Sequence, residues 1–178
     1  EVFTMEEQPV DEQEIWAVLE TALRGACEQF VESRIREGEN LKLDLIEKLD
    51  GMLTDVAAIE KRSPEILQAY RTKLTEKVKE LLSDTQLEES RIATEVILYA
   101  DKICTDEETV RLHSHIESMK QTLQTGGSIG RKLDFIAQEM NREANTILSK
   151  ANDLETSNLA INLKTEIEKV REQIQNIE

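Results

Sequence analysis

Glu139 and Glu143 are the acidic pair whose spacing could bind a metal ion. They are four residues apart in a segment of helical periodicity, so their carboxylates would lie on one flank of a helix. Carboxylate oxygens are the ligands that Mg²⁺ and other hard divalent cations prefer. Lys132 and Lys150 fall on the same flank, however, and could neutralise the two glutamates by ion pairing. The spacing therefore leaves a metal site and a salt-bridged surface both open.

A second group of reactive residues lies in "DEETVRLHSHIESM", residues 106–119. Glu108, Arg111 and His115 share one flank of the expected helix. His113 lies nearly opposite His115, so the two imidazoles cannot bind one metal ion from a regular helix. An imidazole beside a carboxylate and a guanidinium can act as a general base, or contact a phosphate when protonated. A surface histidine in an ion-paired cluster is the alternative that these residues leave open.

The segment "GRKLDFIAQEMNREANTILSKAND", residues 130–153, is unusual for a helix. It has two Asn, a Thr and a Ser within a helical pattern, although their side chains compete for backbone hydrogen bonds. The whole chain has a net charge of −15, which argues against a generic nucleic-acid surface. Residues 129–151 are locally basic: they carry Arg131, Lys132, Arg142 and Lys150 against Asp134, Glu139 and Glu143.

The elements that would position these residues are all helices. Aromatic residues make up only 3% of the chain, and there are six Gly and two Pro, which is typical of long helices with thin cores. Apolar residues recur at helical spacing along almost the whole chain, and "TGGSIG" at 125–130 predicts a turn between helices. A break is expected at residues 37–40, and a kink or a fresh helix start at Ser63-Pro64. The predicted helices cover about residues 11–36, 41–62, 64–82, 87–103, 106–125, 129–152 and 155–177.

The expected organisation is one helical domain, residues 11–178, behind an acidic lead-in at residues 1–10. If residues 40–82 were collinear they would span roughly 65 Å, which exceeds the diameter of a compact domain. This predicts a projecting, coiled-coil-like arm or an antiparallel hairpin among long antiparallel helices. Phe135 falls outside the apolar stripe of its helix, which predicts that another subunit or domain covers it.

Cellular context is also suggested by the sequence. Cys27 and Cys104 match no metal or redox spacing and are expected to be reduced thiols. No apolar run approaches the length of a membrane span, and no signal peptide is visible. Because the chain starts at Glu1 and not at Met, we expect a fragment of a cytoplasmic protein.

Three segments resemble one known family. The ungapped core "RKLDFIAQEMNREA", with "REQIQNIE" at the end of the chain, is similar to the carboxy-terminal domain of the YicC/YloC family of bacterial proteins. "ESRIREGENLKLDL" at 32–45 and "DEETVRLHSHIESM" at 106–119 fit the same family in the same order. Thr109 departs from the family pattern, since it occupies a place that is usually apolar. Family members carry a further amino-terminal α/β domain, and the resemblance implies that this domain is absent here.

The resemblance implies a cytoplasmic, Mg²⁺- or Mn²⁺-dependent endoribonuclease that assembles as a homo-oligomer, a hexamer, with RNA in a common cavity. Glu108, Asp134, Glu139 and Glu143 are then the candidate metal ligands, and His115, Glu139 and Glu143 the candidate catalytic residues. Asp134 lies on the opposite flank from the two later glutamates, so a second helix or subunit would have to contribute. The candidate RNA-binding residues are Arg111, Arg131, Lys132, Arg142, Asn145 and Lys150, with Arg34 and Glu37 as further matches to the family pattern.

Two other functions use the same helix faces. A non-catalytic RNA-binding adaptor would deliver RNA to the decay machinery and would need no acidic metal ligands. A structural oligomerisation domain would use the ion pairs for packing only and would bind no RNA. The sequence alone does not separate cleavage from binding.

Overall fold

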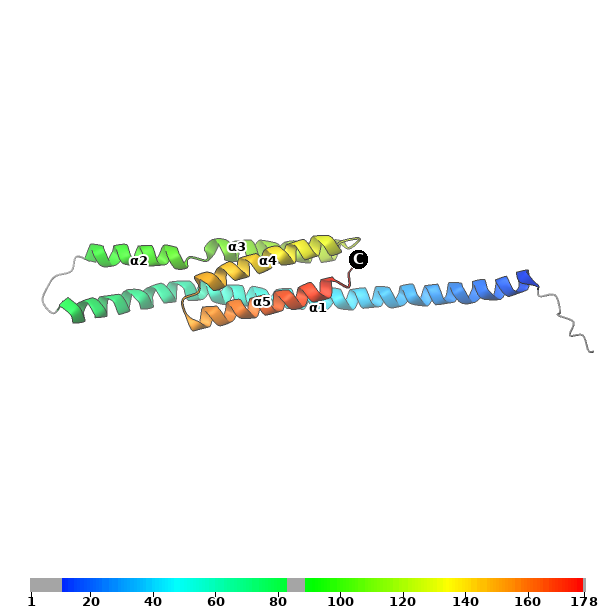
Figure 1. Cartoon of the computed structure of the whole chain (residues 1–178), viewed down its shortest axis with the longest axis horizontal. Helices are drawn as coiled ribbons and strands as arrows, with labels where there is room; N and C mark the ends of the chain where they lie inside the picture. Colours follow the sequence, from blue (N-terminus) through cyan, green and yellow to red (C-terminus); the bar gives the residue numbers. More distant parts are fainter. Residues whose placement is uncertain (1–10, 83–88, 178) are drawn as a thin grey trace, which may run out of the picture. The chain divides into compact units, whose positions relative to one another are not determined.

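The computed structural model describes residues 11–82 and 89–177 of the 178-residue chain (Figure 1). The described residues form helices without any strand, which confirms the predicted all-α fold. The predicted acidic lead-in, residues 1–10, lies outside the described part. The helices are α1 (Glu12–Leu82), α2 (Glu89–Ile103), α3 (Asp106–Thr125), α4 (Gly130–Lys150) and α5 (Leu154–Ile174).

The break predicted at residues 37–40 is wrong, and so is the fresh helix start that was one alternative at Ser63-Pro64. The helix runs without interruption through residues 37–40 and through Pro64. Gly38 costs a helix only about 1 kcal/mol relative to Ala, which neighbouring residues can offset. Pro64 removes one backbone donor, but Val56 and Ile59 on the turns before it are fully buried in the core, which holds this part of α1 in place.

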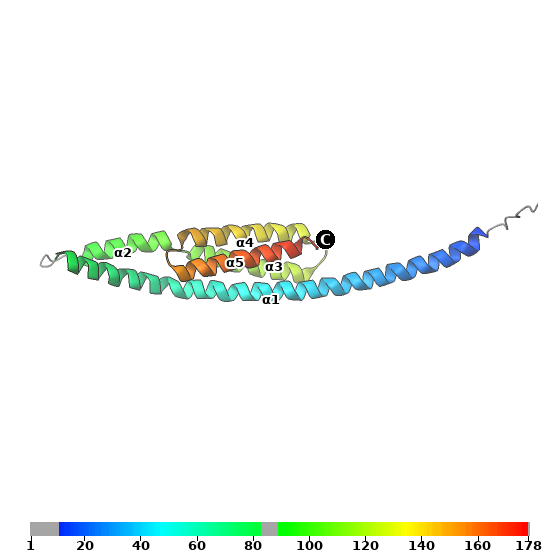
Figure 2. The same cartoon turned by 60° about the horizontal axis from the view of Figure 1, so that its bottom comes forward.

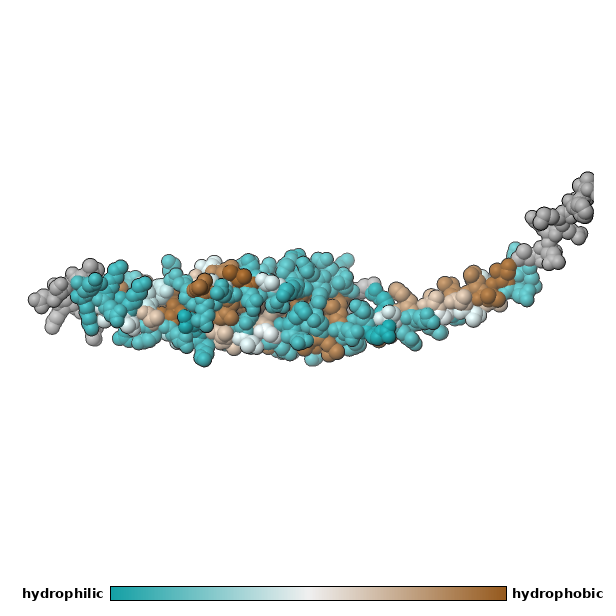
Figure 3. Space-filling model, turned by 90° about the horizontal axis from the view of Figure 1, so that it is seen from below, coloured by the Kyte–Doolittle hydropathy of each residue, from teal (hydrophilic) through white to brown (hydrophobic). Residues whose placement is uncertain are grey.

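The chain divides into two compact units, residues 1–41 and residues 42–178. In the first unit the described residues, 11–41, form a stretch of α1 whose large apolar side chains are exposed. Figure 3 shows hydrophobic side chains along this stretch. They are Ile15, Trp16, Val18, Leu19, Leu23, Phe30, Val31 and Ile35. Within this unit no other described helix covers them.

The second unit is built on a four-helix bundle of α1 from Lys42 onward, α3, α4 and α5 (Figure 2). Each helix contributes apolar residues at helical spacing that are almost completely buried. The largest fully buried side chains are Leu45, Leu49, Met52, Ile59, Leu112, Ile116, Met119, Leu133, Met140, Ile147, Leu163 and Ile167. Residues 45–59 of the predicted arm thus belong to the bundle core, because their apolar face packs there.

The rest of the predicted arm forms an antiparallel pair. The part of α1 after Pro64 runs beside α2 in Figures 1 and 2. The rings of Tyr70 and Tyr99 stack with centroids 3.7 Å apart, and Asn152 donates a hydrogen bond of 2.8 Å to the Tyr99 hydroxyl. We call residues 61–82 of α1 together with α2 the α1–α2 hairpin. These contacts join it to the turn between α4 and α5.

Two short turns connect α3 to α4 and α4 to α5. Gly126 and Gly127 have positive φ, 69° and 87°, which confirms the predicted helix-to-helix turn. Asp153 caps α5, since its carboxylate accepts hydrogen bonds from the backbone N–H groups of Glu155 and Thr156. None of the described helices is long and apolar enough to span a membrane.

Candidate functional site

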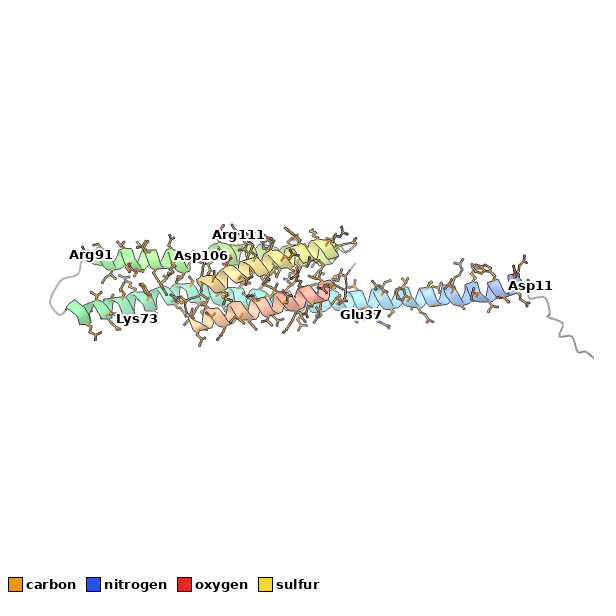
Figure 4. The ribbon with its side chains drawn as sticks, viewed as in Figure 1. Asp11, Glu37, Lys73, Arg91, Asp106 and Arg111 are labelled. Carbon is orange, nitrogen blue, oxygen red and sulfur yellow. The ribbon has the colours of Figure 1, made fainter. Side chains whose placement is uncertain are left out.

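The candidate site is the line of charged residues where α3 lies antiparallel to α4. Packing of the apolar stripes of both helices leaves their charged flanks beside this contact. We call this region the α3–α4 seam. Its residues are Glu107, Glu108, Arg111 and His115 on α3, and Glu139, Arg142, Glu143 and Lys150 on α4. Figure 4 labels Asp106 at the start of α3 and Arg111 just after it.

At one end of the seam Lys150 pairs with Glu108. The Lys150 ammonium donates hydrogen bonds of 2.9 Å to both Glu108 carboxylate oxygens. The Glu108 side chain is only 8% exposed, whereas that of Lys150 is 32% exposed. A buried carboxylate requires such a partner, so Glu108 is committed to Lys150 in this arrangement.

Arg111 lies between two carboxylates in the next part of the seam. Its guanidinium bonds to Glu107 one turn earlier on α3, and lies 3.7 Å from a carboxylate oxygen of Glu143 on α4. The Glu143 side chain is 7% exposed, while that of Arg111 is half exposed. Arg111 therefore keeps an open face towards solvent, where a phosphate could approach, but its charge is already offset.

The outer part of the seam is less tightly paired. Arg142 lies 4.0 Å from Glu139 on the same helix, and its side chain is 77% exposed. His115 lies one turn beyond Arg111 and is half-buried, as is His113 on the other side of α3. Neither imidazole has a hydrogen bond to another residue within 11–82 or 89–177. His115 is thus available for a proton or a phosphate.

The remaining predicted residues lie away from the seam. Asp134 accepts a hydrogen bond of 3.2 Å from Arg171 on α5, and one of 2.7 Å from Gln138 on its own helix. Arg131, Lys132 and Asn145 are exposed on α4. Arg34 and Glu37 belong to the first unit and are exposed there. The structure consequently brings together Glu108, Arg111, Glu143 and Lys150, but not Asp134.

The predicted metal ligands do not fit a metal site within one chain. The described residues contain no group of three or more His, Cys, Asp or Glu side chains that could hold a metal ion. Glu108 and Glu143 have cationic neighbours in the seam, and Asp134 pairs with Arg171 on another face. A chain that bound Mg²⁺ or Mn²⁺ would need carboxylates from another copy, or a rearrangement of these pairs.

Sequence reasoning missed the contacts that hold the bundle around the seam. Arg62 on α1 lies 3.5 Å from Asp153 and 3.3 Å from Glu155, and Lys120 on α3 pairs with Asp50 on α1. The Asp153 cap had a visible signal, since an Asp stands directly before the apolar pattern of α5. The long-range partners of Arg62 and Lys120 leave no local pattern, so periodicity could not reveal them.

Comparison with known proteins identifies similar sequences. Residues 59–178 match the family described as "Endoribonuclease YicC-like, C-terminal", and residues 1–43 match "Endoribonuclease YicC-like, N-terminal region". A "Probable endoribonuclease YicC" of Clostridioides difficile (strain 630) is 44% identical over 179 residues, which cover 100% of this chain and 61% of that protein. A protein of the same description from Haemophilus influenzae is 36% identical over 98% of this chain and 60% of its own length.

The match of residues 1–43 corrects one expectation. A segment of the amino-terminal region is present, so the prediction that this region is absent is wrong. The segment at 32–45 that fits the family lies mostly within this match. The chain spans about three-fifths of the length of the curated relatives that it matches.

Proposed function

The chain belongs to the YicC-like endoribonuclease family, and from this premise we propose that it forms the helical part of an enzyme that cuts RNA at internal phosphodiester bonds. The observation that carries the proposal is the family match over residues 59–178, since this segment contains the whole α3–α4 seam. Both relatives are described as probable endoribonucleases, and neither description names a substrate beyond RNA.

In this proposal the seam binds the scissile phosphate. The open face of Arg111 donates hydrogen bonds to phosphate oxygens and offsets their charge as it increases during cleavage. His115, one turn along α3, takes the proton of the hydroxyl that attacks phosphorus. The bond between phosphorus and the leaving oxygen of the chain then breaks, and that oxygen takes a proton from water. Glu143 lies beside Arg111, and Glu108 pairs with Lys150. Both carboxylates are nearly buried, so in this proposal they position the two cations.

Dependence on Mg²⁺ or Mn²⁺ stays a prediction. If such an ion takes part, Glu139 is the seam carboxylate with the weakest pairing, at 4.0 Å from Arg142, and is the first candidate ligand. The other ligands would come from a second copy of the chain, because Asp134 faces α5. Chelation with EDTA tests the requirement directly, and cleavage that continues in EDTA would remove the metal from this proposal.

We further propose that the protein acts as a homo-oligomer, with a hexamer as the predicted state and RNA in a shared cavity. Phe135 on α4 is 62% exposed, which supports the prediction that another subunit covers it. The exposed apolar side chains of residues 15–35 add a second surface that water disfavours. Native mass spectrometry of the chain would give the number of copies. A cytoplasmic location is a further prediction.

A non-catalytic RNA-binding adaptor is the second candidate. It is favoured by the pairing of Glu108 with Lys150 and of Glu143 with Arg111, because ion-paired carboxylates are poor metal ligands until the pair is broken. Such a protein would bind RNA and pass it to other nucleases of RNA decay. Binding without cleavage would then be observed under all metal conditions.

The deciding experiment is single-turnover cleavage of an end-labelled structured RNA by the full chain, with Mg²⁺, Mn²⁺ or EDTA. RNA binding is measured on the same samples. The Glu139→Gln/Glu143→Gln variant is compared with the unchanged chain. Internal cleavage that the variant loses while it still binds RNA would support the enzyme. Binding without cleavage in every sample would support the adaptor, and no binding at all would contradict both.

A further inference from the structure

Phe135 is the aromatic side chain most open to solvent among the described residues of the second unit. It is 62% exposed, whereas Tyr70 and Tyr99 are half-buried and stack on each other. One exposed apolar residue needs no explanation by itself, because surfaces of folded proteins commonly carry them. The residues around Phe135 on α4 are what make it informative.

Phe135 lies on the side of α4 that is opposite the buried Leu133, Met140 and Ala144. Figure 2 shows α4 on the side of the bundle away from α1, so this side of the helix is turned to solvent. We call its exposed residues, which fall within about 60° of one direction at 100° per residue, the outer face of α4. They are Arg131, Phe135, Gln138, Arg142, Asn145 and Ser149.

The outer face is positively charged, although the protein is acidic. Arg131 has no ion pair or hydrogen bond with a residue in the described part of the chain. Arg142 is 77% exposed and reaches Glu139 only at 4.0 Å. The half-buried Glu139 is the one acid beside this face on α4, since Asp134 is turned to the other flank and pairs with Arg171. Two exposed guanidinium groups thus meet one partly buried carboxylate.

The acids of the neighbouring helices are directed to the flanks of α4. On α3, Glu107 bonds to Arg111 within the seam. On α5, Glu168 and Glu172 line a groove together with Asn141, which lies about 120° around α4 from Phe135. The outer face is therefore not neutralised from either side.

An exposed ring between cations has the chemistry that binds an unpaired base. Nucleobases that are splayed out of a helix stack on Phe, Tyr or Trp rings, and neighbouring cations and amides bind the phosphates and 2′-hydroxyls. Arg131 lies one turn before Phe135 and Arg142 two turns after it, which separates the two arginines by about 16 Å along the helix axis. A strand that follows α4 would therefore pass one cation, the ring and the other cation in turn.

We propose that Phe135 stacks on an unpaired base of RNA, while Arg131 and Arg142 bind phosphates on either side of that base. This inference rests on the proposed action on RNA and names the substrate class, which is single-stranded RNA. The bases of a duplex are stacked on one another, so their faces are closed to a side chain. Stacking accepts every base, so the contact selects unpaired segments without selecting a sequence.

The stacking contact is compatible with the proposed oligomer. The outer face of α4 would line the shared cavity, with RNA between Phe135 and the subunit across it. Direct packing of Phe135 against another copy is disfavoured by its surroundings, because it is the one apolar residue among the six of the outer face.

The test measures the affinity of the full chain for a fluorescein-labelled unstructured single strand of RNA and for a duplex of the same length. Fluorescence anisotropy is recorded in EDTA over a range of KCl concentrations, and gel electrophoresis checks that the RNA stays intact. Phe135→Leu removes the ring but stays apolar, and Phe135→Tyr keeps the ring. The control is Leu98→Ala on α2, where Leu98 is 61% exposed. Circular dichroism checks that all variants remain helical.

We expect Phe135→Leu to bind the single strand roughly tenfold more weakly, and the duplex within about twofold of the unchanged chain. The slope of log affinity against log salt should not change, because the substitution removes no phosphate contact. Phe135→Tyr and Leu98→Ala should bind the single strand within about twofold of the unchanged chain. A further variant, Arg131→Gln/Arg142→Gln, should instead make the slope smaller by about 1 to 1.5.

Four results would overturn the stacking contact. They are undiminished single-strand binding by Phe135→Leu, equal losses of single-strand and duplex binding, an equal loss in Phe135→Tyr, and no preference of the unchanged chain for the single strand. Native mass spectrometry adds a further check. If Phe135→Leu changes the number of copies, the loss of binding belongs to a contact between subunits and not to a base.

The proposed function can fail separately. If the unchanged chain binds neither RNA in EDTA or in Mg²⁺, the proposed action on RNA is wrong, and the role of Phe135 falls with it. If the unchanged chain binds and cuts the single strand but Phe135→Leu does so equally well, only the stacking contact is wrong.

Discussion

The ammonium of Lys150 lies 2.9 Å from both carboxylate oxygens of Glu108, although the two residues are 42 positions apart. The pair joins the last turn of α4 to the first turn of α3, at one end of the seam. Glu108 is nearly buried, and a charged carboxylate in that environment is costly without a cation. The stability of the bundle and the geometry of the seam should therefore depend on the same contact.

Lys150→Met should lower the free energy of unfolding by about 2 to 3 kcal/mol, because it leaves Glu108 buried without a partner. The double variant Glu108→Gln/Lys150→Met should lose less than the single variant, since no buried charge remains. Urea denaturation followed by circular dichroism measures both. Lys164→Met serves as the control, because Lys164 has no described ion pair. A double variant that is less stable than Lys150→Met would contradict a buried charge as the cause.

Asp153→Ala should destabilise the protein by about 1 kcal/mol, the usual cost of losing an N-cap, with a further loss through Arg62. Asp153→Asn should retain most of the capping hydrogen bonds and lose less. Thermal unfolding of the two variants beside the unchanged chain gives the comparison. Similar losses in Asp153→Asn and Asp153→Ala would assign the effect to charge and not to capping.

The carboxylate of Asp153 should also make the stability of the protein depend on pH. Burial on its own would raise the pKa of Asp153, but hydrogen bonds from Thr156 and Glu155 and the charge of Arg62 outweigh it and hold the pKa below its ordinary value. Its stabilising effect is therefore complete above the unfolded pKa of about 3.9 and is lost as pH falls through the lower folded pKa. Stability should fall less on acidification for Asp153→Asn than for the unchanged chain. The control is Asp101→Asn, at an exposed position. Its stability should fall on acidification as much as that of the unchanged chain.

Tyr99→Phe should loosen the hairpin without unfolding the bundle. The substitution keeps the stack on Tyr70 but removes the hydroxyl that accepts from Asn152, at a cost of about 1 kcal/mol. Tyr99→Ala should add the loss of the aromatic pair. Hydrogen exchange followed by mass spectrometry should show faster exchange in α2 for both variants, with α4 unchanged. Uniformly faster exchange over α2 and α4 would mean that the hairpin and bundle unfold together.

Helical periodicity was enough to predict the fold, because amphipathic stripes such as Leu112, Ile116 and Met119 determine which face of a helix is buried. Local signals were misleading at Gly38 and Pro64, through which α1 continues. A weak helix former costs a helix only about 1 kcal/mol, so the exposed helix-forming residues on either side of Gly38 can offset it without any tertiary contact. Proline costs more, and Pro64 lies in the second unit, where α1 packs in the bundle before it and beside α2 after it.

The candidate site was predictable only in part. The flank shared by Glu108, Arg111 and His115 follows from spacing within one helix. That Lys150 pairs with Glu108, and Asp134 with Arg171, depends on how α3 and α5 pack on α4. Ion pairs have no sequence period across helices, so the sequence could propose carboxylates as metal ligands without showing that cations already face them.

His115→Gln should lower the single-turnover rate of RNA cleavage by about 100-fold or more, as removal of a general base does. RNA affinity should change by less than about threefold, since Arg111 and its open face remain. His113→Gln is a matched control, because both histidines are half-buried on α3 but lie on opposite sides of the helix. Its cleavage rate should stay within about twofold of the unchanged chain. If both variants lose cleavage equally, the effect comes from the fold of α3. If neither variant loses cleavage, His115 is not the base, and another group of the seam must accept the proton.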